Sequence, residues 1–434
     1  MNILLNCRRA LLISLIAAGM ARAQSSGAPF KYDFGPGRVA PGYTQVLPET
    51  VYTRELGYGF EPGAAVKGVD RGGKDAIRGD FVTGDQPFFF SMAVPEGNYR
   101  VTITFGDSEG ETATTVKAEL RRLMLESVRT ARGRFETRTI TVNVRRPQIA
   151  GGGEVRLKER ERTTEIWAWD EKLTLEFNGS HPTVCAIEIR RVEDLPTVYL
   201  LGDSTVCDQP REPYNSWGQM LPRFFKSGVA VANHAESGES LRSSLGAQRL
   251  KKVLSLMKPG DYLFIQYGHN DQKEKGEGVG AFTTYQNDLR NFVAEARRRG
   301  GIPVLVTSMN RRNFGPDGKV YSTLGDYPEA VRQVAKEERV PLIDLNPMSK
   351  ALYEALGPEQ SGLLFKSGDG THHSNYGSYE LAKCIVEGIK LNRLGLVKHL
   401  TGEGPAFDPK HPDPFESFQI PASPLNTELK PLGN

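Results

Sequence analysis

Five short apolar segments, each followed along the chain by a stretch with helical periodicity, constrain the fold more than any other feature. The apolar segments cover residues 198–201, 229–232, 262–267, 302–307 and 341–344. The helix-period stretches cover residues 217–225, 241–257, 282–299, 328–338 and 376–394. Buried strands that alternate with amphipathic helices indicate a parallel sheet covered by helices on both faces. In such sheets, ligands bind beyond the carboxyl ends of the strands.

The first half of the chain has a different pattern, one typical of a β-sandwich. Runs rich in strand-forming residues, such as 88–92, 99–105, 172–177 and 184–189, are separated by clusters of Gly, Pro, Asp and Asn. Residues 116–134 fit either a helix or a charged edge strand. We therefore expect a β-sandwich over 24–194, an α/β domain over 195–400 and a tail over 401–434. The tail contains seven prolines, and it either wraps the domain or stays loose.

Residues 1–23 have the pattern of a secretory signal peptide. Arg8-Arg9 precedes an apolar run that ends at Gly19, and Ala21-Arg22-Ala23 forms a small-x-small cleavage site. The apolar run is about half the length that a membrane span needs, although an unusual anchor helix is the alternative. We expect a mature protein that is secreted or periplasmic and has no membrane span.

Charge and cysteine content exclude several classes of protein. Lys and Arg total 55 and Asp and Glu total 52, and three of the arginines lie in the first 23 residues, which hold no acidic residue. The balanced charge of the remainder is unlike that of a dedicated nucleic-acid binder, so we expect no nucleic-acid partner. Three cysteines follow the signal peptide and allow at most one internal disulfide. Without a CxxC pair or an HExxH motif, we expect no structural zinc site.

Polar motifs follow three of the predicted strands. Gly202-Asp203-Ser204-Thr205 follows the first strand, a glycine at 238 follows the second, and Gly268-His269-Asn270-Asp271 follows the third. A serine just beyond a strand exposes its hydroxyl in a tight turn, and a glycine lets a backbone N–H approach a substrate oxygen. The Asn270 amide is suited to face a developing oxyanion. Taken alone, each motif is more typical of a helix cap or a turn.

A fourth motif, Asp369-Gly370-Thr371-His372, comes just before the last predicted helix and is followed by His373. An Asp three residues ahead of a His fits one turn, so its carboxylate can hold the imidazole Nδ1–H and leave Nε2 as a base. The spacing favours His372 as the base and His373 as a neighbour or a substrate contact. The alternatives are a surface histidine pair or half of a metal site.

Together, the four motifs resemble the ordered blocks of the SGNH, or GDSL-type, hydrolase family over residues 197–395. Ser216-Trp217-Gly218-Gln219 and Gly238-Glu239-Ser240-Leu241-Arg242-Ser243 make the chain most similar to rhamnogalacturonan acetylesterases. The resemblance implies a flavodoxin-like, three-layer α/β/α domain. It also implies a Ser204–His372–Asp369 triad, an oxyanion hole made by Ser204, Gly238 and Asn270, and neither a metal nor a cofactor. Glu239 departs from the family, in which a basic residue often follows this glycine.

The resemblance implies a secreted serine esterase that deacetylates a plant cell-wall polysaccharide, most of all rhamnogalacturonan. Its substrate is then an acetylated polysaccharide or oligosaccharide. The alternatives are an acetylxylan esterase, a lipase or thioesterase of the same fold and, from another class, a glycan-binding protein without activity. Candidate substrate contacts are Arg242, His373 and Trp217.

The first domain resembles the galactose-binding-like sandwiches that accompany carbohydrate enzymes, through residues 32–37 and 57–60. Within it, Trp167 and Trp169 are spaced to face one side of a strand. They form either a platform on which a sugar stacks or part of the core. The domain therefore either binds glycan or only supports its neighbour, and the sequence leaves the oligomeric state open.

Overall fold

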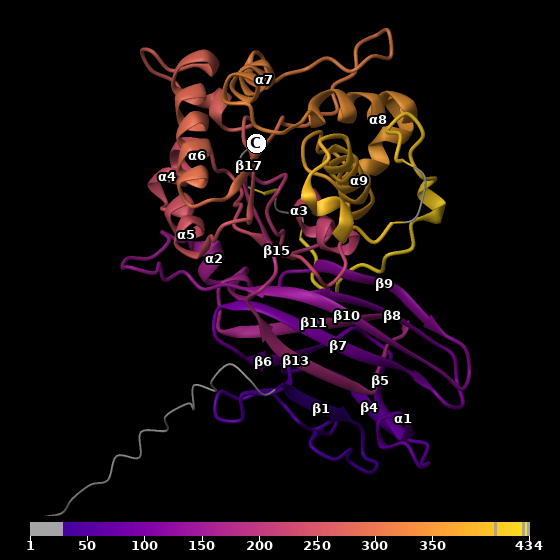
Figure 1. The fold of residues 1–434 in the computed structure, drawn as a ribbon. Helices are drawn as coiled ribbons and strands as arrows, with labels where there is room; N and C mark the ends of the chain where they lie inside the picture. The colour runs from indigo at the N-terminus through magenta and orange to yellow at the C-terminus, as the bar shows by residue number, and fades with distance from the viewer. Residues whose placement is uncertain (1–28, 403–405, 428–429, 432–434) are drawn as a thin grey trace, which may run out of the picture.

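The computed structural model describes residues 29–402, 406–427 and 430–431 (Figure 1). The predicted signal peptide, residues 1–23, lies outside the described residues. Two bodies follow one another along the chain, a β-rich one and an α/β one, and they pack side by side. None of the helices in the described ranges is long and apolar enough to cross a membrane.

Two five-stranded sheets form the first domain and face each other across an aromatic core. One sheet has the order β10 (Arg134–Val144), β7 (Gly97–Asp107), β13 (Ala186–Val192), β1 (Phe30–Phe34) and β2 (Thr44–Val46). The other has the order β3 (Tyr58–Phe60), β6 (Phe88–Ala93), β11 (Lys172–His181), β8 (Thr112–Ala118) and β9 (Arg122–Thr130). The core includes Phe34, Phe60, Phe90, Phe105 and Phe177. The predicted sandwich is therefore present.

Smaller elements complete this domain. A three-stranded sheet contains β12 (Thr183–Val184), β5 (Asp80–Gly84) and β4 (Val66–Asp70), and α1 (Ala76–Gly79) precedes β5. Between β10 and β11, the long segment 145–171 carries α2 (Glu159–Arg162) and the 3₁₀ helix η1 (Ile166–Ala168). Residues 116–134, for which the sequence left a helix or a strand open, form the end of β8, all of β9 and the turn into β10.

A five-stranded parallel sheet forms the second domain, in the order β15 (Ala230–Asn233), β14 (Thr197–Gly202), β16 (Tyr262–Gln266), β17 (Ile302–Val306) and β18 (Leu342–Ile343). In chain order this is 2-1-3-4-5, the flavodoxin-like arrangement. The fold class predicted from the sequence is thus confirmed. The first strand lies in the interior of the sheet, so the ends of the second and third strands flank its own end.

Helices cover both faces of this sheet (Figure 1). One face packs against α3 (Trp217–Met220), α8 (Leu345–Gln360) and α9 (Asn375–Leu391), and the other against α4 (Leu241–Gly246), α5 (Arg249–Leu256), α6 (Gln286–Arg298) and α7 (Tyr327–Glu338). Alternate residues of β14 point to opposite faces: Val198 and Leu200 join the first helical layer, and Tyr199 and Leu201 join the second.

Three helices differ from the sequence prediction. The predicted helix 241–257 is two helices, because Gln248 has a left-handed backbone with φ of 63°. The predicted helix 217–225 continues from α3 as a 3₁₀ helix, η2 (Leu221–Phe224), that contains Pro222. The sequence did not predict α8, whose last turn contains Pro358.

The two domains share a junction that the C-terminal segment crosses. The edge strand β10 packs beside β15, and the β8–β9 hairpin packs against α3 and η2. Ser423 donates from its backbone N–H to Glu212 of the second domain (2.8 Å) and from its hydroxyl to Glu176 of the first (2.7 Å). Of the two possibilities for the tail, the described part of it therefore wraps the molecule.

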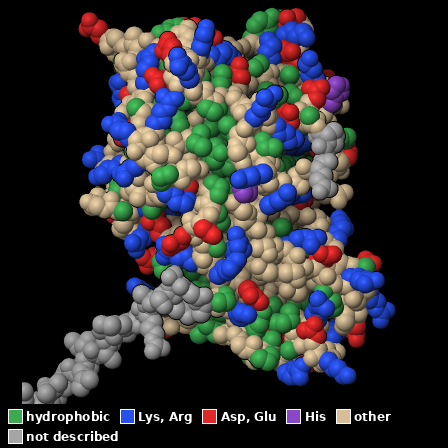
Figure 2. Space-filling view, in the orientation of Figure 1, with side chains coloured by type: hydrophobic (Ala, Val, Ile, Leu, Met, Phe, Trp, Pro, Cys, Tyr) green, Lys and Arg blue, Asp and Glu red, His purple; other side chains and the backbone are tan. Residues whose placement is uncertain are grey.

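The charge on the surface is mixed, as the composition indicates, and the three cysteines that the structure describes are unpaired. Figure 2 shows basic and acidic side chains interspersed over one face of the molecule. Cys185, Cys207 and Cys384 are buried free thiols. No disulfide therefore joins the cysteines within the described ranges.

Candidate active site

The turn after β14 presents Ser204 at the carboxyl edge of the parallel sheet. The N–H groups of Val206 and Cys207 both donate to the Asp203 carbonyl at 3.0 Å, which closes a tight turn around the serine. Gly202 is required before it, because a Cβ there would lie 2.6 Å from the Val206 side chain and 2.7 Å from the Gln266 carbonyl. The strand and its turn thus fix the position of the hydroxyl.

Ser204, His372 and Asp369 form a continuous hydrogen-bonded chain. The Ser204 Oγ lies 3.0 Å from His372 Nε2, and His372 Nδ1 lies 2.8 Å from Asp369 Oδ2. The other oxygen of Asp369 accepts the N–H groups of Thr371 (2.8 Å) and His372 (3.1 Å). Burial alone would raise the pKa of Asp369, but the hydrogen bonds from His372 and Thr371 hold that pKa well below its usual range. The carboxylate therefore stays charged and orients the imidazole.

Gly238 and Asn270 lie on the two strand ends that flank Ser204, on the β15 and β16 sides respectively. Gly238 has a φ of 77°, a conformation that favours glycine. The loop that carries it is tied to β14, since the Glu236 N–H donates to the Gly202 carbonyl at 3.0 Å. The Asn270 amide donates to the Glu239 carbonyl at 3.0 Å, which links the two flanking loops. This arrangement can supply N–H donors from both sides of the serine.

His269 and Asp203 form a second buried pair beneath the serine, one that the sequence analysis did not single out. His269 Nδ1 lies 3.3 Å from Asp203 Oδ2, and the other Asp203 oxygen accepts the Thr205 N–H (2.9 Å) and hydroxyl (2.7 Å). Burial alone would raise the pKa of Asp203, but His269 and Thr205 lower it. The pair fixes the Ser204 turn to the third strand end. In the sequence, the only sign of this pair is that Asp203 and His269 stand inside two of the motifs.

Two cationic side chains also lie beside the site, and no sequence motif pointed to them. The Lys273 ammonium donates to the Asn270 side-chain oxygen at 3.3 Å. Arg311, in the loop after β17, donates to the Thr371 hydroxyl (3.2 Å) and to the His269 carbonyl (3.4 Å). Burial lowers the pKa of both cations. Positive charge on this side of the site favours a substrate that carries a carboxylate.

Two candidate substrate contacts, His373 and Trp217, have their rings turned towards core residues. His373 Nε2 lies 2.9 Å from the Tyr353 hydroxyl, and its ring packs 4.4 Å from that of Phe365. Burial lowers the pKa of His373 to about 3, so this ring stays neutral. Trp217 lies in the core, where its indole N–H donates to the Gln266 side chain at 2.8 Å. Both residues support the site from beneath.

The other predicted contacts lie at the surface or outside the site. Arg242 is exposed on α4, with its Nε 3.9 Å from an Asp288 oxygen. Trp167 and Trp169 lie on and just after the 3₁₀ helix η1, not on a strand, so they do not form a common face. Trp169 is buried beneath the Arg145 guanidinium, whereas Trp167 is half-buried beside Phe89. A platform made of both tryptophans is therefore wrong.

Three buried carboxylates, Glu161, Glu165 and Glu236, lie close enough to hold a metal ion. Arginines already occupy the position between them: Arg160 lies 2.8 Å from both Glu165 and Glu236, and Arg249 makes a bidentate pair with Glu161 at 2.7 and 3.0 Å. Burial and the neighbouring Glu236 raise the pKa of Glu165 to about 9. The cluster is a buried network of carboxyl groups and arginines at the domain junction, in which Glu165 holds its proton at neutral pH.

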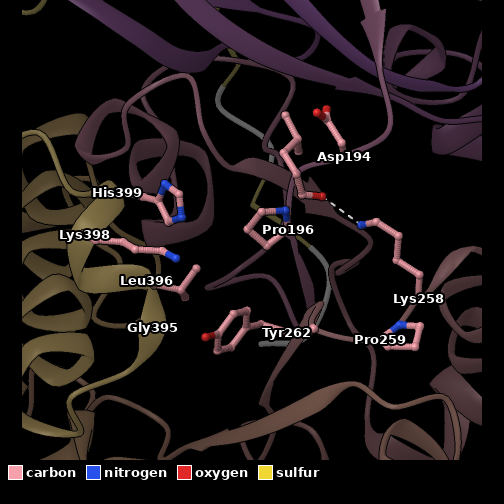
Figure 3. Close-up of a pocket in the computed structure, with 11 residues that line it drawn as sticks. Asp194, Pro196, Lys258, Pro259, Tyr262, Gly395, Leu396, Lys398 and His399 are labelled. Atoms are coloured by element: carbon pink, nitrogen blue, oxygen red, sulfur yellow. Dashed lines mark hydrogen bonds between the residues drawn. The ribbon is translucent and has the colours of Figure 1, made fainter.

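A large cavity, of about 380 Å³, lies at the opposite edge of the parallel sheet from Ser204. Pro196 and Tyr262, which line it, precede β14 and begin β16, and Lys258 and His399 complete its rim (Figure 3). Because ligands of parallel sheets bind at the carboxyl ends of the strands, this cavity is not the candidate active site.

Comparisons with known proteins identify relatives of both domains. Residues 200–378 match the GDSL-like lipase/acylhydrolase family, and residues 30–137 match the galactose-binding domain-like region of β-agarase/YXIM esterase-like proteins. The chain is 44% identical over 218 residues to the rhamnogalacturonan acetylesterase RhgT of Bacillus subtilis, which covers 47% of this chain and 93% of that protein.

Two further comparisons extend over both domains. The chain is 30% identical over 380 residues to the uncharacterized esterase YxiM of Bacillus subtilis, which covers 83% of this chain and 90% of that protein. The crystal structure of Bacillus subtilis YxiM matches 85% of this chain and 100% of that one, with 26% identity and a TM-score of 0.45. The chain therefore belongs to the GDSL-like lipase/acylhydrolase family, as an ester hydrolase that carries an N-terminal galactose-binding-like domain.

Proposed function

We propose that this protein is an exported acetylesterase that removes acetyl groups from rhamnogalacturonan. The observation that carries the proposal is the hydrogen-bonded chain from Ser204 through His372 to Asp369 at the end of β14. Similarity to RhgT supports the choice of polymer. Lys273 and Arg311 support it independently, since the backbone of rhamnogalacturonan carries uronate carboxylates that cations bind.

We infer the following role for each group in the reaction. His372 Nε2 takes the proton of the Ser204 hydroxyl as the oxygen attacks the acetyl carbonyl. The backbone N–H groups of Ser204 and Gly238 and the Asn270 amide stabilise the negative charge that forms on the carbonyl oxygen. His372 then protonates the sugar oxygen, which leaves as an alcohol. Water attacks the acetyl-enzyme by the same route and releases acetate.

We also propose that the N-terminal domain binds glycan at a cavity of about 230 Å³ on the junction. Trp167 and Ile166 line it from the first domain, Arg211 from the second and Leu425 from the C-terminal segment. Ile166 is 43% exposed, and Arg211 has no ion-pair partner among the described residues. An aromatic ring beside an unpaired arginine suits a sugar that bears a carboxylate.

The test is acetate release from acetylated rhamnogalacturonan, acetylated xylan and a long-chain ester, by the purified protein and by Ser204→Ala. We expect release from rhamnogalacturonan that the variant abolishes. A preference for xylan would keep the serine mechanism and overturn the choice of polymer. A preference for the long-chain ester would indicate a lipase, and release from none of the three, with retained polymer binding, would indicate a glycan-binding protein.

A further inference from the structure

We infer that Arg121, in the N-terminal domain, is a positioning residue for the active site in the second domain. It holds in place both the loop that follows the nucleophile and the start of the helix that follows the base. This inference rests on the proposed roles of Ser204 and His372. It assigns Arg121, which also lines the junction cavity proposed to bind glycan, a second function in catalysis.

The β8–β9 turn inserts Arg121 into the second domain. Glu119 and Arg121 both have left-handed backbones, with φ of 54° and 60°, which residues other than glycine seldom adopt. The side chain of Arg121 is 6% exposed. The next residue, Arg122, is also buried and pairs with Asp208 of the second domain at 3.0 Å. The turn thus buries two consecutive arginines against the loop that follows Ser204.

Arg121 satisfies four acceptors, three in the loop after Ser204 and one at the start of α9. Its Nη1 donates to the backbone carbonyls of Gln209 (3.0 Å) and Tyr214 (2.9 Å). Its Nη2 lies 2.6 Å from Glu212 Oε1 and donates to the Asn375 side-chain oxygen at 3.3 Å. A guanidinium has enough donors in a fixed plane for this set, and an ammonium does not.

Two of these acceptors belong to residues in contact with a catalytic residue, and a third lies close to one along the chain. The Gln209 side chain donates to the Ser204 carbonyl at 2.8 Å. The Tyr214 ring meets the His372 imidazole edge-on, with centroids 5.9 Å apart. Asn375 is the first residue of α9, three positions after His372. A shift of Arg121 would therefore move the serine and the histidine relative to each other, and proton transfer depends on the 3.0 Å between them.

The experiment compares Arg121→Lys and Arg121→Ala with wild type on 4-nitrophenyl acetate, a small ester that makes no use of a glycan site. We expect kcat to fall about 10-fold or more in the lysine variant and further in the alanine variant, with KM changed less than 3-fold. Thermal unfolding would establish that each variant is folded. The matched control is Glu126→Gln, which weakens the junction contacts of Glu126 with Arg223 (2.9 Å) and with Tyr379 of α9 (3.0 Å) and leaves the loop after Ser204 untouched.

The outcomes separate this inference from the proposed function. If the wild-type protein does not hydrolyse the small ester, or Ser204→Ala still does, the proposed function fails. If the wild type is active and a folded Arg121→Lys variant keeps the wild-type kcat, the positioning role is overturned. If Arg121→Ala does not fold, the kcat of Arg121→Lys alone decides whether the positioning role holds. An equal loss of kcat in Glu126→Gln would show that any damage to the junction has this effect and would also overturn the assignment.

Discussion

Asp369 illustrates how single atoms decide the chemistry at the residue scale. One of its oxygens binds the His372 ring, and the other binds two backbone N–H groups, so the carboxylate cannot rotate without losing hydrogen bonds. The imidazole is therefore held with Nε2 towards Ser204 and the proton on Nδ1. An amide in the same place would keep the shape but change which ring nitrogen carries the proton.

Asp369→Asn is accordingly expected to lower kcat by about 10³–10⁴-fold while the fold is retained. The asparagine N–H would donate to His372 Nδ1, so the ring proton would stay on Nε2. A protonated Nε2 cannot accept the proton of Ser204. Steady-state hydrolysis of 4-nitrophenyl acetate and a thermal melt would check this. A folded variant within 10-fold of wild type would contradict the assigned role.

The two candidate substrate contacts that lie in the core share one cause. Trp217 and His373 stand next to family motifs, and sequence proximity alone suggested substrate contact. Both point into the core, where Gln266 and Tyr353 satisfy their polar atoms. Which way a side chain points depends on the packing of helices α3 and α8 around it, and that packing is not visible in a local motif.

At the scale of elements, the close approach of α9 sets the position of the base. Ser374 caps this helix by accepting the Gly377 N–H at 3.2 Å. A Cβ on Gly377 would lie 1.9 Å from the Leu364 carbonyl oxygen, so only glycine lets the first turn pack there. His372 lies just before this turn, and its place depends on that contact.

We expect Gly377→Ala to destabilise the protein by about 1–3 kcal/mol, because the backbone must move to admit the methyl group. The matched control is Gly246→Ala, at the exposed end of α4, where an added Cβ meets nothing within 4 Å. That change should be neutral or slightly stabilising. Urea unfolding of both variants would test the contrast, and equal stabilities would refute the packing argument.

The strands of the parallel sheet were predictable to within one or two residues, since each is an apolar run buried on both faces. The β8–β9 hairpin was not. Its charged residues suggested a helix or an exposed edge, yet Lys117 and Arg122 are buried and pair with partners distant in sequence. Residues 345–360 were left without an element, although they form α8.

At the scale of the whole molecule, buried charges join the two domains. Glu165 of the first domain and Glu236 of the second both lie 2.8 Å from Arg160, and burial with the nearby Glu236 raises the pKa of Glu165 to about 9. In the unfolded chain, this carboxyl releases its proton near pH 4.5. The folded protein binds the additional proton between these values, so its stability falls as pH rises from about 4.5 to about 9.

Glu165→Gln should remove that part of the pH dependence, because an amide has no proton to release. We expect its melting temperature to equal or exceed that of wild type at pH 9, and the difference to shrink towards pH 5. The control is Glu159→Gln, the same change at an exposed position on α2. Its melting temperature should equal that of wild type at pH 5 and at pH 9. Thermal melts across this range would check the sign. A larger benefit at pH 5 than at pH 9 would contradict it.

The junction cavity that we propose as a glycan site can be tested by substitution. Trp167→Ala is expected to raise KM for acetylated rhamnogalacturonan about 5-fold or more and to leave kcat for 4-nitrophenyl acetate unchanged. Phe415→Ala, which removes an exposed aromatic outside this cavity, is the control. Equal KM values for wild type and Trp167→Ala would remove glycan binding from this cavity.

The C-terminal segment has a consequence for biosynthesis. Ser423 bonds to Glu176 and Glu212 together, and it is made after every strand and helix of the two domains that it joins. During translation, the sandwich and the α/β domain can each begin to fold, but their junction lacks this connection until residue 423 is free of the ribosome. The loop between Ser204 and Tyr214, which carries Glu212, therefore reaches its final hydrogen bonding only after both domains have been synthesised.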